Sequence, residues 1–297
     1  MLADAGVNRV SLGIQTLSEP VQRRINRIQP FVQVASAVDR LKRAGIGSFN
    51  ADLMYGLPTQ TEEDILETVE AVVQLNPSRI SLFGYAHVPW MKPHQLMIDE
   101  VELPDAQSRF AQLMAGAGAL AGAGYRRIGL DHFARPDDVL ARAAGEGRLR
   151  RNFQGYTDDD ATTLIGFGAS AISETPDGYA QNLTPIPDWQ RAVFEGRLPV
   201  AKMRALSPED RLRRRVIEDL MCDRTVDLEQ VLARHAQRPD LLDDCLARLA
   251  EPARDGLVEI DGRRLRVTEC GWPFMRNVAA AFDAYLVPDE TRHARAV

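Results

Sequence analysis

The sequence is poor in cysteine, and its three cysteines, Cys222, Cys245 and Cys270, stand far apart along the chain. Because no CxxC or CxxxCxxC spacing occurs, the residues alone predict neither a disulfide framework nor a thiolate metal site. Thiols that serve as small apolar side chains are the simplest interpretation.

The sequence also lacks long apolar runs and an excess of positive charge. No apolar run approaches the roughly 18–20 residues that a membrane-spanning helix needs, and residues 1–5 do not form the start of a signal peptide. We therefore expect a cytosolic protein with no membrane partner. The formal net charge of -6 disfavours a protein that binds nucleic acid mainly through phosphate contacts.

The first ninety residues alternate strand-like and helix-like segments. Strands are expected at 9–15, 49–55 and 79–85, and helices at 20–26, 32–44 and 61–75. Thr61 and Asp64 predict a capping box at the start of the third helix. Such alternation is typical of βαβ units with a parallel sheet, so the fold class is α/β.

Polar residues stand at or just after the carboxyl ends of these strands. They are Gln15, Asp52, Tyr55, Tyr85 and His87. Each one alone is also compatible with an ordinary loop residue. Because ligands bind at this edge of parallel α/β sheets, their recurrence on three strands favours a binding site there.

The expected secondary structure of the rest of the chain changes near residue 200. Further helices are expected at 104–124 and 136–145, a strand and loop at 125–133, and little regular structure at 185–199. Beyond Ser207 we expect helices at 208–222, 228–235, 241–251 and 271–285, and a hairpin at 256–268 that turns at Asp261–Gly262. The predicted domains are therefore residues 1–200 and a helical, winged-helix-like domain at 201–297.

The winged-helix-like pattern raises the alternative of a DNA-binding regulator. Its candidate recognition helix, residues 239–249, carries three aspartates and one arginine. A helix that faces phosphates needs the opposite balance, so a packing or lid domain is favoured and no nucleic-acid partner is expected.

Two short segments combine unusual chemistry. Asp131, His132 and Arg135 fall within five positions, and residues 151–157 read Arg-Asn-Phe-Gln-Gly-Tyr-Thr. Loops of this kind on a rigid scaffold often carry function. His132 is equally compatible with a packed core histidine.

These segments resemble one family, the oxygen-independent coproporphyrinogen III oxidases, which are radical S-adenosylmethionine enzymes of haem biosynthesis. The resemblance extends over essentially the whole chain and is most specific at 131–138 and 151–157. The other matching segments are 6–15, 21–27, 52–58, 170–173 and 179–182. It implies a partial (β/α)6 barrel, of which this chain contains the C-terminal half.

The resemblance also implies an activity. Members of the family oxidatively decarboxylate two propionates of coproporphyrinogen III to vinyl groups, which gives protoporphyrinogen IX. An electron donor and a [4Fe-4S] cluster reduce S-adenosylmethionine, and a 5′-deoxyadenosyl radical takes hydrogen from the substrate. The cofactors carry this chemistry and the protein positions them.

Residues that match the family motifs identify candidate binding positions. The resemblance places S-adenosylmethionine contacts at Gln15, Arg27, Asp52, Ala86 and Ile172. Arg27 suits a carboxylate, and Asp52 and Gln15 suit hydroxyl or ammonium groups.

The substrate carries four carboxylates, so cations near the specific motifs are expected to meet them. His132, Arg135 and Arg151 are the candidates. The residues responsible for catalysis are not assigned.

The family's CxxxCxxC loop, which holds the cluster, has no counterpart in this sequence. By the resemblance, Met1 corresponds to a position just before the fourth barrel strand, so we expect an N-terminally truncated member without metal ligands, and a monomer. Its first strand, residues 9–15, would then have an unpaired edge and lower the solubility of the chain. A misassigned start codon is an alternative explanation of the missing loop.

A second family-level alternative is a haem-trafficking relative, which shares the barrel but binds haem and has no decarboxylase activity. The motif at 131–138 argues against it, since those relatives carry other residues there.

We predict that this chain alone is catalytically inactive, because a cluster of this kind needs thiolate ligands. The measurement is an anaerobic assay after reconstitution with iron and sulfide. Cleavage of S-adenosylmethionine by the chain alone would contradict the prediction.

Overall fold

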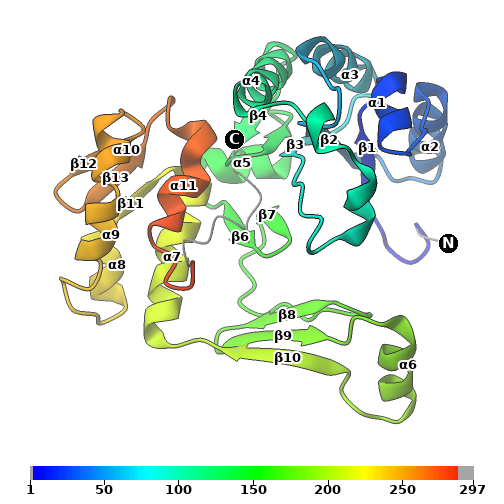
Figure 1. Ribbon diagram of the computed structural model, residues 1–297. Coiled ribbons are helices and arrows are strands. Elements are labelled where there is room, and N and C mark those ends of the chain that lie inside the picture. The colour runs from blue at the N-terminus through cyan, green and yellow to red at the C-terminus, as the bar shows by residue number, and fades with distance from the viewer. Residues whose placement is uncertain (1–2, 287–297) are drawn as a thin grey trace.

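The computed structural model describes residues 3–286 and has an α/β fold (Figure 1). Its first part is built on a five-stranded sheet. The strands, in spatial order, are β1 (Arg9–Gln15), β2 (Ser48–Tyr55), β3 (Arg79–Gly84), β5 (His132–Ala134) and β4 (Arg126–Ile128). The first three are parallel, whereas β5 is antiparallel to both β3 and β4. The three strands expected from the sequence are thereby confirmed, and the expected strand and loop at 125–133 is a short hairpin.

Helices connect these strands as the alternating pattern predicts. They are α1 (Glu19–Arg24), α2 (Phe31–Arg43), α3 (Glu62–Gln74) and α4 (Ala106–Gly122), with short 3₁₀ helices η1 (Pro93–Met97) and η2 (Glu100–Glu102). The capping box of α3 is confirmed: Thr61 Oγ1 accepts from the amide of Asp64 at 3.2 Å, and the Asp64 carboxylate accepts from the amide of Thr61 at 2.8 Å. Both bonds satisfy amides that the first turn of a helix leaves free.

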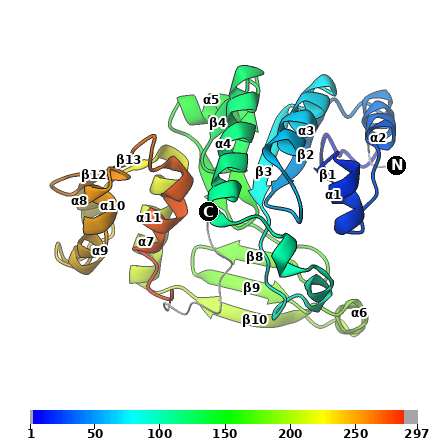
Figure 2. The same cartoon turned by 45° about the horizontal axis from the view of Figure 1, so that its top comes forward.

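The five-stranded sheet has one apolar and one polar face, because successive side chains of a strand point to opposite sides. On the apolar face, Phe49, Leu53, Ile80 and Leu82 are buried and belong to one core with side chains of α2, α3 and α4. Figures 1 and 2 show α3 and α4 side by side against the strands. The helices thus close one face and leave the other for the site.

The middle of the chain forms two smaller sheets. One is the hairpin of β6 (Arg150–Asn152) and β7 (Gly155–Thr157), and the other is antiparallel, with β8 (Ile172–Thr175), β9 (Gly178–Asn182) and β10 (Val200–Ala205). Their helices are α5 (Val139–Gly145) and α6 (Ile186–Phe194). The expectation of little regular structure at 185–199 is wrong for α6. Pro185 and Pro187 lie at its start, where a helix does not need their missing amide hydrogens.

The C-terminal part consists of helices around a three-stranded sheet. The helices are α7 (Pro208–Asp223), α8 (Leu228–Arg234), α9 (Asp243–Arg248), α10 (Ala250–Arg254), η3 (Trp272–Phe274) and α11 (Met275–Ala280). The strands are β11 (Thr225–Asp227), β12 (Val258–Asp261) and β13 (Arg264–Val267). The hairpin turns at Gly262, with φ of 57°, as predicted.

Two expected helices of this part are shorter than the sequence pattern indicates. The segment 241–251 contains α9 and the start of a separate helix, α10. Pro252 explains the break, because its ring clashes with the carbonyl four residues earlier and it has no amide hydrogen to donate. The segment 271–285 is helical only from Trp272 to Ala280.

Separate hydrophobic cores support the first and last parts of the chain. Helices α7, α8, α9 and α11 share one core with the hairpin of β12 and β13. The five-stranded sheet has another core. The boundary predicted at residues 200 and 201 falls inside β10, which pairs with β9. Two residues connect the parts. Leu130, from the first part, is buried in the C-terminal core, and Trp272, from the C-terminal part, is buried in the core of the five-stranded sheet.

Two further features concern the edges and the surface. Among the described residues, β1 has β2 as its only strand neighbour.

Within residues 3–286, no helix combines the length and apolar character that a membrane span requires.

We predict that Arg79→Met destabilises the fold strongly. Arg79 Nε donates to Asp138 Oδ1 at 2.8 Å, and both side chains are less than a tenth exposed. Removing one partner of such a pair leaves an uncompensated buried charge, which costs about 3–5 kcal/mol. The free energy of unfolding in urea measures the loss.

A matched control is Arg43→Ala, which breaks the exposed ion pair between Arg43 and Asp39. Surface pairs contribute about 0–1 kcal/mol, so this variant should unfold close to wild type. Equal losses in the two variants would contradict the prediction.

Candidate functional site

The carboxyl end of β1 brings Gln15 and Arg27 together over Gly13. Arg27 Nη2 donates to the Gly13 carbonyl at 2.7 Å, and Gln15 has a left-handed backbone with φ of 67°. A Cβ at position 13 would lie 2.7 Å from Gln15 Nε2 and 3.2 Å from Arg27 Nη2. Glycine therefore leaves room for the ends of both side chains, which a Cβ would displace.

The strand register places four residues in one row across the polar face of the sheet. Gly13 pairs with Asp52, Asp52 with Ser81, and Ser81 with His132. Neighbouring strands are about 4.8 Å apart, so about 14 Å separate the ends of this row. Asp52 and His132, which the sequence assigns to cofactor and substrate, thus lie on one face, two strands apart.

Asp52 is half-buried and carries hydrogen bonds that organise its carboxylate. Asn50 Nδ2 donates to Asp52 Oδ1 at 2.6 Å and also to Ser81 Oγ at 3.1 Å. Burial raises the pKa of Asp52, while hydrogen bonds from Ser81 and Asn50 and the nearby charge of His132 oppose that rise. The carboxylate is therefore held at some cost in solvation.

Ala86 and Ile172, the other two predicted cofactor positions, lie in different parts of the fold. Ala86 follows β3 at the same carboxyl edge as Gln15, and its carbonyl accepts from Gln95 Nε2 at 3.0 Å. Ile172 begins β8 in the separate antiparallel sheet, which Figure 1 draws below the five-stranded sheet. The structure thus gathers Gln15, Arg27, Asp52 and Ala86 at one edge and places Ile172 in another sheet.

His132 lies between two rings at the other end of the row. Its imidazole makes edge contacts with Phe83 at 5.7 Å and with Tyr156 at 5.2 Å between ring centroids. Nδ1 is 2.7 Å from Asp131 Oδ1. The imidazole also lines a cavity of about 340 Å³ on the polar face. It therefore has a packed environment and also an open edge.

The loop before His132 is shaped by Tyr156. The Tyr156 hydroxyl accepts a hydrogen bond from the amide of Leu130 and donates one to the carbonyl of Met221, both at 3.1 Å. Gly129 has φ of 58°, and a Cβ there would lie 2.1 Å from Tyr156 Oη. The two specific motifs of the sequence are thus joined in space: the tyrosine of the second fixes the loop of the first.

The hairpin of β6 and β7 separates two cavities. The first, on the polar face of the five-stranded sheet, includes His132, Asn50 and Arg79 in its lining. The second, of about 350 Å³, lies between the hairpin, β8 and α7. Asn152 and Thr157 line both. The motif at 151–157 is therefore the wall between them.

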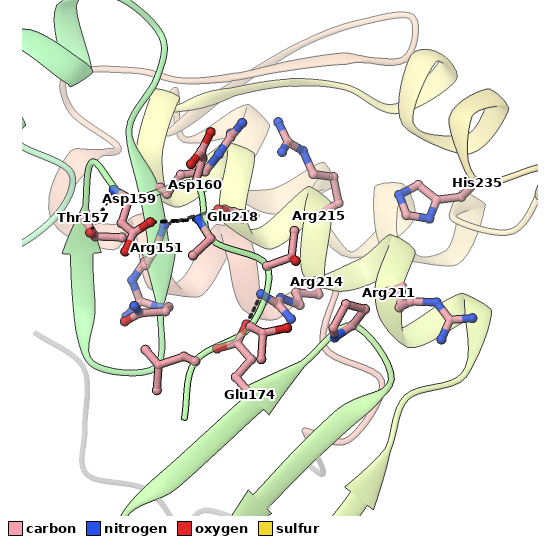
Figure 3. A pocket seen from close by; sticks show the side chains of 17 residues that line it. Arg151, Thr157, Asp159, Asp160, Glu174, Arg211, Arg214, Arg215, Glu218 and His235 are labelled. Atoms are coloured by element: carbon pink, nitrogen blue, oxygen red, sulfur yellow. Dashed lines mark hydrogen bonds and ion pairs between the residues drawn. The ribbon is translucent and has the colours of Figure 1, made fainter. Parts of the chain in front are cut away.

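Charged side chains of both signs line the second cavity, shown in Figure 3. It is lined by Arg150, Arg151, Arg211, Arg214 and Arg215, together with several carboxylates. Figure 3 marks the ion pair of Arg214 with Glu174 and the hydrogen bond from the Arg151 amide to Glu218, which is 3.2 Å long. Arg151 Nε is buried and has no hydrogen-bond partner among the described residues. An anionic group would stabilise an unpaired buried donor of this kind.

Arg135, the third predicted substrate residue, lies elsewhere. Its guanidinium binds Asn76 and Asp137, and its amide donates to the carbonyl of Ser78. These partners stand at the end of the sheet where β3 begins, and neither cavity includes Arg135 in its lining. The structure brings His132 and Arg151 to the two sides of one hairpin and does not bring Arg135 to them.

The residues at β1 and β2 fit S-adenosylmethionine, the cofactor that the resemblance implies. A guanidinium, an amide and a carboxylate lie close together, and Gly13 leaves space above the strand. Arg27 is suited to a carboxylate, and Asp52 to an ammonium or hydroxyl group.

The cysteines do not fit the implied iron–sulfur cluster. Burial raises the pKa of the Cys222 thiol to about 12, whereas cluster ligands are thiolates. Cys245 is buried in the C-terminal core and Cys270 is exposed. Within the described part of the chain, no group of three or more His, Cys, Asp or Glu could hold a metal ion.

Asp52→Asn is predicted to stabilise the fold at neutral pH. Because burial raises the pKa of Asp52, its contribution to stability is fully present below the ordinary pKa of about 3.9 and is lost as the pH rises through the raised value. Asparagine keeps an acceptor for Asn50 without the buried charge. We expect a higher melting temperature than wild type at pH 7 and little difference below about pH 4.

Asp39→Asn is the control for Asp52→Asn, because Asp39 is exposed and pairs with Arg43 on the surface of α2. A melting temperature of Asp52→Asn below that of wild type at pH 7 would show that the ionised carboxylate stabilises the fold.

Two family models match separate segments of the chain. Residues 1–72 match the radical SAM superfamily, and residues 206–274 match the HemN C-terminal domain. The first segment contains β1 and β2 with Gln15, Arg27 and Asp52, and the second contains most of the C-terminal helices and the hairpin.

Several similar proteins are described as coproporphyrinogen III oxidases. The oxygen-independent coproporphyrinogen III oxidase of Bradyrhizobium diazoefficiens is 50% identical over 99% of this chain. Its counterpart from Helicobacter pylori strain 26695 is 39% identical over 96%. The solved structure of coproporphyrinogen III oxidase (HemN) from Escherichia coli has a TM-score of 0.89 and 39% identity, over 96% of this chain and 66% of that one.

The chain spans 65% of the length of the Bradyrhizobium relative and 63% of the Helicobacter relative. Both family models, the sequence relatives and the solved structure point to the same family, and the relatives and the solved structure named above align with 96% or more of this chain. The chain therefore belongs to the radical SAM family of oxygen-independent coproporphyrinogen III oxidases.

Proposed function

We propose that the chain supplies the substrate side and part of the S-adenosylmethionine site of an oxygen-independent coproporphyrinogen III oxidase. The observation that carries this proposal is the row from Gly13 to His132, which puts both predicted sites on one polar face. The relatives named for this activity support it. The reaction is the oxidative decarboxylation of two propionates to vinyl groups.

At the cofactor end, the residues bind and orient. Arg27 would pair with the carboxylate of S-adenosylmethionine, and Asp52 would accept from its ammonium or hydroxyl groups. Gln15 and Ala86 would contact it from the same edge, and Ile172 would approach from β8. When bound and supplied with one electron from outside this chain, S-adenosylmethionine would provide the radical chemistry that a protein side chain cannot.

At the substrate end, two cavities flank the hairpin of β6 and β7. Coproporphyrinogen III carries four carboxylates, and Arg151 offers a buried Nε without a partner in the described chain. His132 lines the cavity on the other side of the hairpin. The substrate would therefore meet residues of both specific motifs, with Arg151 holding a propionate.

The finer architecture is part of the same proposal. β1, β2 and β3 with their helices would be half of a partial (β/α)6 barrel, and the C-terminal part a winged-helix-like domain. A boundary after β10, near Leu206, agrees with the pairing of β10 and β9 better than one at residue 200. An external electron donor, a cytosolic location and a monomeric state stay predictions of the sequence.

We predict that Arg151→Ala weakens binding of coproporphyrin III, the stable oxidised form of the substrate. Losing one charge-assisted hydrogen bond costs about 1.5–3 kcal/mol, so Kd should rise about tenfold or more. Quenching of porphyrin fluorescence measures the affinity. Arg148→Ala is the matched control, because Arg148 is exposed and pairs with Glu146.

Haem is the competing ligand in the same titration. A chain that binds haem but not coproporphyrin III would favour the haem-trafficking relative over the proposed enzyme. Equal affinities of wild type and Arg151→Ala for coproporphyrin III would contradict the role of Arg151.

A further inference from the structure

The C-terminal part of the chain contacts the motif at 131–138 directly. Arg276 on α11 donates from Nη2 to Asp131 Oδ2 at 2.8 Å, across 145 positions of sequence. The other carboxylate oxygen of Asp131 is the one that lies 2.7 Å from His132 Nδ1. One carboxylate thus joins a guanidinium of the C-terminal part to the imidazole at the cavity.

The geometry decides which nitrogen of neutral His132 carries the proton. Desolvation would raise the pKa of Asp131, but the hydrogen bond to His132 and nearby positive charges, those of Arg276 and Arg151 among them, outweigh it and leave the pKa below its usual range. An ionised carboxylate can only accept hydrogen bonds. Nδ1 must therefore donate, and Nε2 keeps a free lone pair.

The free nitrogen lies on the open side of the ring. A Cβ on Gly155 would lie 3.8 Å from Nε2, so the absence of a side chain at this position of β7 keeps the edge clear there. Gly155 and His132 line the same cavity. Phe83 and Tyr156 contact the ring itself, which restricts its rotation.

We propose that Arg276 is a positioning residue: through Asp131 it holds neutral His132 with the proton on Nδ1 and presents Nε2 to the cavity as a hydrogen-bond acceptor. The ligand group that this nitrogen suits is an N–H or O–H donor. This deepens the proposed function, on which the identity of the ligand rests. In coproporphyrinogen III the matching donors are pyrrole N–H groups rather than carboxylates.

Other charged groups also lie near His132. Asp52 is two strands away on the same row and interacts with His132 electrostatically. Arg9 and Arg79 line the same cavity, and Arg151 acts on Asp131. The tautomer is therefore best measured at alkaline pH, where histidine rings are neutral and only the position of one proton differs.

The test is a long-range ¹H–¹⁵N spectrum of the whole chain, labelled at its five histidines. His132→Gln assigns the signal of interest. In wild type we expect Nδ1 protonated and Nε2 bare. Asp131→Ala should convert most of the signal to the Nε2-protonated form that free imidazole side chains prefer. Arg276→Gln should give a mixture of the two forms.

The matched control is Arg266→Gln, which removes an exposed guanidinium of the same C-terminal part that pairs with Glu259. It should leave the His132 signal unchanged. Arg276 is 59% exposed, so its replacement is expected to leave a folded chain even if Asp131→Ala does not fold. A melting curve of each variant checks this.

Two results would overturn the inference. One is a wild-type His132 that carries its proton on Nε2, and the other is an Arg276→Gln spectrum identical to wild type. Neither measurement needs S-adenosylmethionine, a cluster or substrate. A failure of coproporphyrin III to bind would therefore contradict the proposed function without touching the assignment of Arg276.

Discussion

The register of the parallel strands is the constraint on which the rest of the site depends. Because side chains alternate along a strand, a shift of one residue in β2 would move Asp52 to the helix-covered face and bring an apolar neighbour into its place. The observed pairing keeps Gly13, Asp52, Ser81 and His132 in one row. The core of Phe49, Leu53, Ile80 and Leu82 fixes that register from the other side.

The polar face is maintained against its own desolvation cost. Ser81 is fully buried and Asn50 nearly so, and each satisfies the other through a side-chain hydrogen bond. Buried polar groups without such partners are expensive, so the network explains why the strands tolerate them. Asp52 adds a charge to this network. Its raised pKa shows that the hydrogen bonds from Ser81 and Asn50 do not fully offset the cost of burying that charge.

Local patterns in the sequence predict much of this fold, whereas long-range contacts decide what they miss. The three parallel strands, the capping box at Thr61 and the turn at Gly262 depend on neighbouring residues and are confirmed. The sequence pattern does not predict helix α6, because prolines in the first turn of a helix also indicate irregular structure. Arg276 carries no local signal, since its partner lies 145 positions away.

The anchoring of the loop at 129–132 has a consequence for how the chain folds. Trp272 Nε1 donates to the carbonyl of Gly129 at 3.0 Å, and Leu130 is buried among side chains of the C-terminal core. A nascent chain folds from its N-terminal side while synthesis continues. The sheet can therefore assemble early, but this loop must wait for residues more than 140 positions later. The surface that we propose for the substrate is thus completed almost last, after the scaffold that carries it.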